Sequence, residues 1–156
     1  MLTGRARGCG QVGVIRKTPY ISLAVMNSAL EFHDSEVADI RVSGAELHVV
    51  FESAYIHRSL GRPGIDAGSG YAQPAEMVFS EAQYTESQGS CRGAISDGTI
   101  STAGAKFDGV VPLPFSAPGR VSATITFVSG GVLEIISSGV SCVPTGPARF
   151  VEAYDG

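Results

Sequence analysis

The sequence predicts an all-β protein: a single-domain antiparallel β-sandwich or flattened barrel of about eight or nine short strands. Three observations predict this class. Apolar and polar residues alternate along several short segments, as they do in strands with one buried face. Turn residues separate these segments, and the 20 glycines and 8 prolines are spread along the chain. No segment of adequate length carries a helical period, so we predict no α-helix.

The length and composition fit one globular domain. A chain of 156 residues, with 44% hydrophobic and 17% charged residues, can bury a sizeable core without a disulfide or a metal ion. We assign residues 26–156 to the all-β domain. Residues 1–25 are basic and glycine-rich, and we expect them to form an N-terminal extension or, at Tyr20–Val25, an edge strand. They lack the long apolar run of a secretory signal or a membrane span.

The clearest element is a β-hairpin centred on Gly44-Ala45. A two-residue turn with glycine in first place suits type II′ geometry. That register pairs apolar residues with one another: Val42 with Leu47, Ile40 with Val49, and Ala38 with Phe51. A slip of one residue would set apolar side chains against polar ones, so this register is strongly specified. His48 then lies on the polar face opposite Arg41, and His57 lies on the apolar face if the strand continues without a bulge.

Loops and further short strands follow the hairpin. Residues 60–70 contain four glycines and a proline, which predicts a loop. Extended segments are then predicted at Tyr71–Tyr84, Cys91–Ile95, Thr99–Thr102 and Gly109–Leu113. The last strand is predicted at Ala148–Tyr154, after a turn between Pro144 and Pro147.

A second hairpin joins Arg120–Val128 to Val132–Val140. Ser129-Gly130-Gly131 suits a three-residue loop, because glycine adopts positive φ without strain. The expected register pairs Phe127 with Leu133, Ile125 with Ile135, and Ala123 with Ser137. Its second face mixes apolar and polar residues, so we expect other parts of the protein to cover this face more than the polar face of the first hairpin.

Charge is distributed unevenly along the chain. Residues 1–19 hold four basic side chains and no acidic one. The rest of the chain therefore has seven basic and all 15 acidic side chains. An acidic body argues against nucleic acid or an anionic membrane as the partner. A basic protein partner is favoured electrostatically. The sequence does not indicate an oligomeric state.

The cysteines and one glycine-rich motif predict no cofactor. Cys9, Cys91 and Cys142 form no Cys-x-x-Cys pair, which excludes a zinc ribbon and a thioredoxin-type motif. A Cys91–Cys142 disulfide stays open, although buried reduced thiols in a cytoplasmic protein are the preferred interpretation. Residues 8–13 match the letters of the dinucleotide fingerprint, but no strand precedes them and no helix follows, so we treat the match as chance.

The histidines mark the best candidates for a site. His33 stands with Asp34 where the first strand begins, and His57 stands with Arg58 where the second ends, beside the glycine-rich loop. Tyrosines near that loop could form a pocket rim. The predicted ligand or interface residues are His33, Asp34, Tyr55, His57, Arg58, Asp66 and Tyr71. A metal site built from His33, His57 and either Asp34 or Asp66 is an alternative, although no pair has the compact spacing of a zinc site.

No catalytic constellation stands out. The chain has no Gly-x-Ser-x-Gly elbow. Four glutamates could supply a carboxylate pair for glycoside chemistry: Glu31, Glu52, Glu76 and Glu81. Their positions are explained equally well if they are solvent-exposed residues on strand faces. There is no tryptophan to form a sugar platform. We therefore predict no catalytic residue and favour a binding protein over an enzyme.

Two stretches, 30–53 and 148–154, carry a resemblance. The segments Leu30-Glu31-Phe32-His33-Asp34-Ser35, Gly44–Phe51 and Phe150-Val151-Glu152 are similar to small uncharacterised bacterial β-proteins, some of which resemble toxin-immunity proteins. The resemblance implies a cytoplasmic bacterial protein that binds another protein and possesses no catalytic residue, and toxin neutralisation is the specific activity that it implies. A small-ligand or metal-binding β-sandwich with a site near His33, His57 and residues 60–70 is the alternative.

Overall fold

The computed structural model describes residues 26–156, which form ten strands and no helix. In chain order the strands are β1 (Asn27–Ser43), β2 (Glu46–Ser59), β3 (Gly68–Ser80), β4 (Gln83–Ser87), β5 (Gly93–Ser101), β6 (Lys106–Asp108), β7 (Val110–Leu113), β8 (Phe115–Phe127), β9 (Val132–Pro144) and β10 (Arg149–Tyr154). All the strand pairings are antiparallel. No helix in this part of the chain could therefore cross a membrane.

Six strands close into a barrel in the order β1-β2-β3-β9-β8-β5, and β5 pairs back to β1. Four outer strands are added to it: β4 beside β9, β6 beside β5, β7 beside β1 and β10 beside β3. The all-β prediction is confirmed. Of the two predicted architectures, the structure has a barrel and not a sandwich, and it has ten strands in total where about eight or nine were predicted. Long strands that change neighbours along their length let one sheet close on itself.

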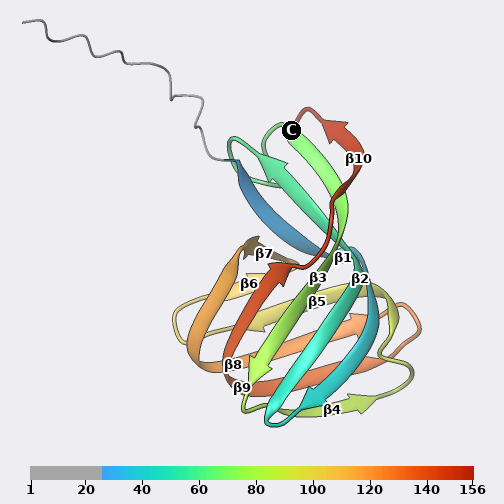
Figure 1. Ribbon diagram of the computed structural model, residues 1–156, viewed down its shortest axis with the longest axis vertical. Coiled ribbons are helices and arrows are strands. Elements are labelled where there is room, and N and C mark those ends of the chain that lie inside the picture. Colours follow the sequence, from blue (N-terminus) through green and yellow to red (C-terminus); the bar gives the residue numbers. More distant parts are fainter. Residues whose placement is uncertain (1–25) are drawn as a thin grey trace, which may run out of the picture.

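β1, β2 and β3 are 17, 14 and 13 residues long, and each serves two parts of the molecule. One part of each lies in the barrel wall. The other part projects beyond the barrel, where β10 pairs with β3 and β7 pairs with β1, as Figure 1 shows. We call residues 27–31, 55–59, 68–72 and 149–154 the projecting end.

The hydrophobic core fills the barrel. Its largest fully buried side chains include four phenylalanines, which come from β1, β2, β3 and β8: Phe32, Phe51, Phe79 and Phe127. Buried aliphatic residues from β5 and β9 complete it, among them Ile95, Ile100, Leu133 and Ile135. Cys91 and Cys142 are buried and are not joined by a disulfide.

The first hairpin forms as predicted close to its turn. Gly44 has φ of 62°, as the first central position of a type II′ turn requires. Val42 pairs with Leu47 and Ile40 pairs with Val49. The third predicted pair is wrong, because a bulge adds a residue to β1 and brings Val37 opposite Phe51. The displaced Ala38 is consequently exposed.

A second bulge changes which way the end of β2 faces. The register between β2 and β3 shifts between Phe51 and Ala54. Inward-facing positions therefore run 47, 49 and 51 before the bulge, and 54 and 56 after it. His57 consequently shares the outer face of the sheet with His48, and its predicted placement on the core face is wrong.

The second hairpin forms with a register two residues away from the predicted one. Ile125 pairs with Leu133, and Ala123 pairs with Ile135. A shift of two keeps every side chain on its predicted face, so alternation alone cannot detect it. The Val128 amide donates instead to the carbonyl of Ala94 in β5, so Val128 does not pair within the hairpin.

Other boundaries also differ from the prediction. The last three residues of the expected 60–70 loop belong to β3, which starts at Gly68. Tyr71–Tyr84 is interrupted by a turn between β3 and β4. Two short strands were expected at Cys91–Ile95 and Thr99–Thr102, whereas the structure has one continuous strand, β5, from Gly93 to Ser101. The final strand forms as expected, and the edge strand expected at Tyr20–Val25 lies outside the described residues.

Candidate functional site

The projecting end carries a hollow of about 270 Å³ on its outer face. β1 and β2 supply part of its wall, β10 supplies the opposite part, and the loop before β3 contributes one glycine. Its lining residues are Glu31, Asp34, Tyr55, His57, Gly64, Glu152 and Tyr154. We call it the acidic hollow.

Glycines in β3 make the acidic hollow possible. β3 lies between β2 and β10, and it places Gly70 directly opposite both His57 and Glu152. A Cβ atom on Gly70 would collide with the Tyr55 hydroxyl oxygen. Because Gly70 has no side chain, Tyr55 crosses above β3 and reaches Glu152 on the far strand.

Hydrogen bonds join side chains of β1, β2 and β10 across the space above Gly70. The His57 ring lies between a carboxylate and a phenol: Nε2 is 2.8 Å from Glu31 Oε2, and Nδ1 is 2.8 Å from the Tyr154 hydroxyl. The Tyr55 hydroxyl donates to Glu152 Oε2. The His57 ring also packs edge-on against both tyrosine rings, with centroid distances of 5.0 and 5.5 Å. These contacts fix the orientation of every ring in the hollow.

Both tyrosines are held in the neutral form. Burial raises the pKa of Tyr55 above its usual value, and the adjacent Glu152 carboxylate raises it further. Burial also raises the pKa of Tyr154, with smaller contributions from Glu31 and Glu152. The Tyr55 hydroxyl therefore donates a hydrogen bond to Glu152, and neither tyrosine adds charge to the site.

The hollow has an excess of negative charge. Three carboxylates line it together with one histidine, and neither lysine nor arginine is among its lining residues. Glu31 and Glu152 each use one oxygen for the bonds described above, and no donor within residues 26–156 reaches the other oxygen. Glu31 is 29% exposed, so part of this unbalanced charge lies away from bulk water. Such a site attracts a cation.

Asp34 and His33 stand at the rim of the site. Asp34 has φ of 77°, an uncommon value that aspartate tolerates better than most residues. It occupies the irregular stretch where the pairing of β1 with β2 is interrupted. His33 lies 3.3 Å from the Asp34 carboxylate, but its side chain is 66% exposed and does not line the hollow.

The remaining predicted site residues lie elsewhere. Arg58 and Tyr71 occupy the opposite face of the projecting end, where the guanidinium lies 4.4 Å from the centre of the tyrosine ring. Tyr71 packs edge-on against Phe150 of β10. Asp66 binds Arg62 within the 60–67 turn, and this contact holds the pKa of Asp66 below its usual value. The structure therefore brings together Asp34, Tyr55 and His57 of the predicted set.

The prediction missed the contribution of β10. Glu152 and Tyr154 were not among the predicted site residues, and Glu31 was considered only as a possible member of a catalytic pair. The spacing of two residues between Glu152 and Tyr154 does place both side chains on one face of a strand. The Gly-x-Gly at residues 68–70 was a second signal, because glycines within a strand mark a close approach by other groups.

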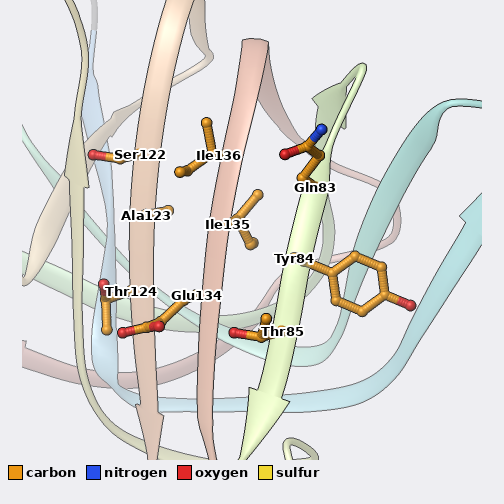
Figure 2. Close-up of a pocket in the computed structure, with 9 residues that line it drawn as sticks. All are labelled: Gln83, Tyr84, Thr85, Ser122, Ala123, Thr124, Glu134, Ile135 and Ile136. Carbon is orange, nitrogen blue, oxygen red and sulfur yellow. The ribbon is translucent and has the colours of Figure 1, made fainter.

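A second, larger hollow of about 390 Å³ lies on the outside of the barrel across β8, β9 and β4. Figure 2 shows its side chains, with Thr124, Glu134 and Thr85 in one row across the three strands. Ile136 forms part of the next row and is 45% exposed. This surface offers one carboxylate among hydroxyl and aliphatic groups, so it lacks the concentrated charge of the acidic hollow.

Within residues 26–156, no three histidine, cysteine, aspartate or glutamate side chains are arranged to hold a metal ion. Of the alternative metal site, Asp66 is paired with Arg62 outside the hollow, and His33, although 3.3 Å from Asp34, does not line it.

The chain was also compared with known proteins. No family model, no curated protein and no solved structure matches it.

Proposed function

We propose that this protein is a non-enzymatic protein-binding domain, and that its acidic hollow receives a lysine or arginine side chain of a basic partner. The observation that carries this proposal is the unbalanced charge of the hollow: three carboxylates and no lysine or arginine among its lining residues. A cationic side chain would satisfy the free oxygens of Glu31 and Glu152.

Aromatic walls favour the same kind of ligand. The rings of Tyr55 and Tyr154 flank His57 in the hollow. A guanidinium or ammonium group bound among carboxylates gains additional stabilisation beside a tyrosine face. Arginine fits best, because its planar group can bond a carboxylate with two donors while stacking on a ring.

The acidic excess of the chain from residue 20 onward also favours a basic partner. From residue 20 onward, 15 acidic side chains stand against seven basic ones. A basic partner would be steered toward this surface, and the effect would weaken with added salt. The two stretches that resemble immunity-type proteins, 30–53 and 148–154, contain Glu31, Asp34, Glu152 and Tyr154 of the hollow. That resemblance makes toxin neutralisation a specific form of the proposed activity.

The experiment is affinity capture from a lysate of the source organism at about 0.15 M salt. The wild type is compared with a Glu31→Gln/Glu152→Gln variant and with Glu134→Gln, which alters the carboxylate of the outer hollow. We expect the wild type and Glu134→Gln to retain the same basic protein, and the double variant to lose it. Equal capture by the double variant, or no captured protein at all, would contradict the proposal.

A small cationic ligand is a second candidate for the same hollow. His57 and Gly64 line it, and these residues belong to the region near His57 and the 60–70 segment that the sequence indicates for a small ligand. A volume of about 270 Å³ suits a compact amine. Saturable binding of free arginine or a polyamine with micromolar affinity, together with no captured protein, would favour this candidate.

A further inference from the structure

β10 is an edge strand that offers its backbone to another chain. It pairs with β3 on one side, and no other strand among residues 26–156 pairs with it. Figure 1 shows it at the margin of the projecting end. The free edge of a strand carries unpaired N–H and C=O groups and is a template for a further strand.

The side chains of β10 do little to protect this edge. Phe150 is 56% exposed and Val151 is 41% exposed. Arg149 supplies the only basic charge of the strand, at its start, and Glu152 turns toward the acidic hollow. Protected edges often carry proline or a central lysine, and β10 has neither. Its pairing with β3 does contain one bulge, between Phe150 and Glu152, which is another feature that protects edges.

The position of the acidic hollow specifies what kind of strand would fit. A strand added to β10 would place its side chains about 5 Å from those of β10 on the same face. On the face of Glu152 and Tyr154, a lysine or arginine would meet the second carboxylate oxygen of Glu152, at the entrance of the acidic hollow. On the other face, an apolar residue would pack beside Phe150, which already contacts Tyr71.

We propose that the partner binds as an extended segment of alternating basic and apolar residues, which pairs with the free edge of β10 and directs its basic side chains into the acidic hollow. This inference rests on the proposed function and adds the manner of binding. A second copy of the chain is the less favourable occupant, because both copies would carry the same acidic excess.

The test uses a blocked Val-Arg-Val-Arg-Val-Arg-Val peptide and two N-methylated forms, one methylated on the arginines and one on the valines. Binding is measured by calorimetry, and amide hydrogen exchange of residues 149–154 is followed in the full chain. We expect the unmodified peptide to bind and to slow amide exchange in β10. At least one methylated peptide should bind about tenfold or more weakly, because methylation removes hydrogen bonds to the edge. We expect Glu152→Gln to weaken binding and Glu134→Gln to leave it unchanged.

The outcomes separate this inference from the proposed function. Equal binding of all three peptides without slower exchange in β10 would overturn the edge pairing and leave the basic-side-chain pocket standing. If blocked arginine binds and the peptides do not, the edge pairing is likewise overturned and the basic-side-chain pocket stands. Failure of the peptides and of blocked arginine would overturn both proposals. Slow exchange in β10 without peptide, together with a dimer in light scattering, would assign the edge to a second copy and overturn the inference.

Discussion

The barrel and the projecting end share β1, β2 and β3, and the apolar core reaches the inner face of the projecting end through Leu30 and Ile56, but the two regions differ in the contacts that dominate them. In the barrel, alternate residues of β1, β2 and β3 enter an apolar core with residues such as Phe51 and Phe79. In the projecting end, the outer faces of the same strands carry a polar network that joins Glu31, His57 and Tyr154. The barrel therefore provides stability, and the projecting end provides chemical specificity, because polar groups fix geometry more than they add net free energy.

The largest difference between the two regions should appear on truncating a core side chain. Phe51 is 1% exposed and belongs to the barrel core. We expect Phe51→Ala to lower the free energy of unfolding by about 3–5 kcal/mol, through lost burial and the cavity left behind. Urea unfolding followed by circular dichroism measures it. A loss no larger than that from Tyr154→Phe would remove the energetic contrast between the regions.

A single methyl group should disturb the projecting end. In Gly70→Ala the new Cβ would meet the Tyr55 hydroxyl, so the ring must move and its bond to Glu152 must break. We expect a loss of about 1–3 kcal/mol. Gly104→Ala is the control, because no atom lies within 4 Å of its added Cβ. If both variants melt at the wild-type temperature, the glycine gap is not what positions Tyr55.

Removing one hydroxyl should loosen β10 without affecting the barrel. Tyr154→Phe deletes the bond to His57 Nδ1 and keeps the aromatic ring. We expect a local cost of about 1 kcal/mol, which corresponds to faster amide exchange by about fivefold in residues 149–154. Exchange in β8 and β9 should not change. Uniformly faster exchange in all strands would show that the two regions unfold as one unit.

Alkaline pH should weaken the projecting end through Tyr55. Its pKa is raised from the ordinary value of 10.0, so the folded state holds the proton more tightly than the unfolded chain. The stabilisation is therefore complete below about pH 10 and is lost as the pH rises further. Melting temperatures measured from about pH 8 to about pH 11 should fall less steeply in Tyr55→Phe than in the wild type. Tyr84→Phe, on the outer hollow, should retain the wild-type slope.

The sequence predicted the barrel better than the projecting end, for a physical reason. Alternation of apolar residues specifies faces, and it placed Ile40, Val49 and Leu133 correctly in the core. It cannot detect a shift by two residues, as in the second hairpin, nor a bulge such as the one after Phe51 that turns His57 outward.

The acidic hollow was only partly predictable. Tyr55 and His57 stand close to the glycine-rich 60–70 segment, and Asp34 adjoins His33 at the expected start of a strand, so the sequence indicates all three. Their partners Glu152 and Tyr154 come from a strand about 97 residues away, and only the pairing of β10 with β3 brings them near. Local patterns carry no information on such a pairing.

The most direct test of the central claim is an NMR titration of the full chain with blocked arginine. We predict that the amide shifts change in a saturable manner near Glu31, His57 and Glu152, and that these changes disappear in Glu31→Gln/Glu152→Gln and persist in Glu134→Gln. Blocked citrulline, which has the same shape without the charge, should cause no such change. Shifts of equal size with citrulline, or in the double variant, would contradict the claim that the acidic hollow binds a basic side chain.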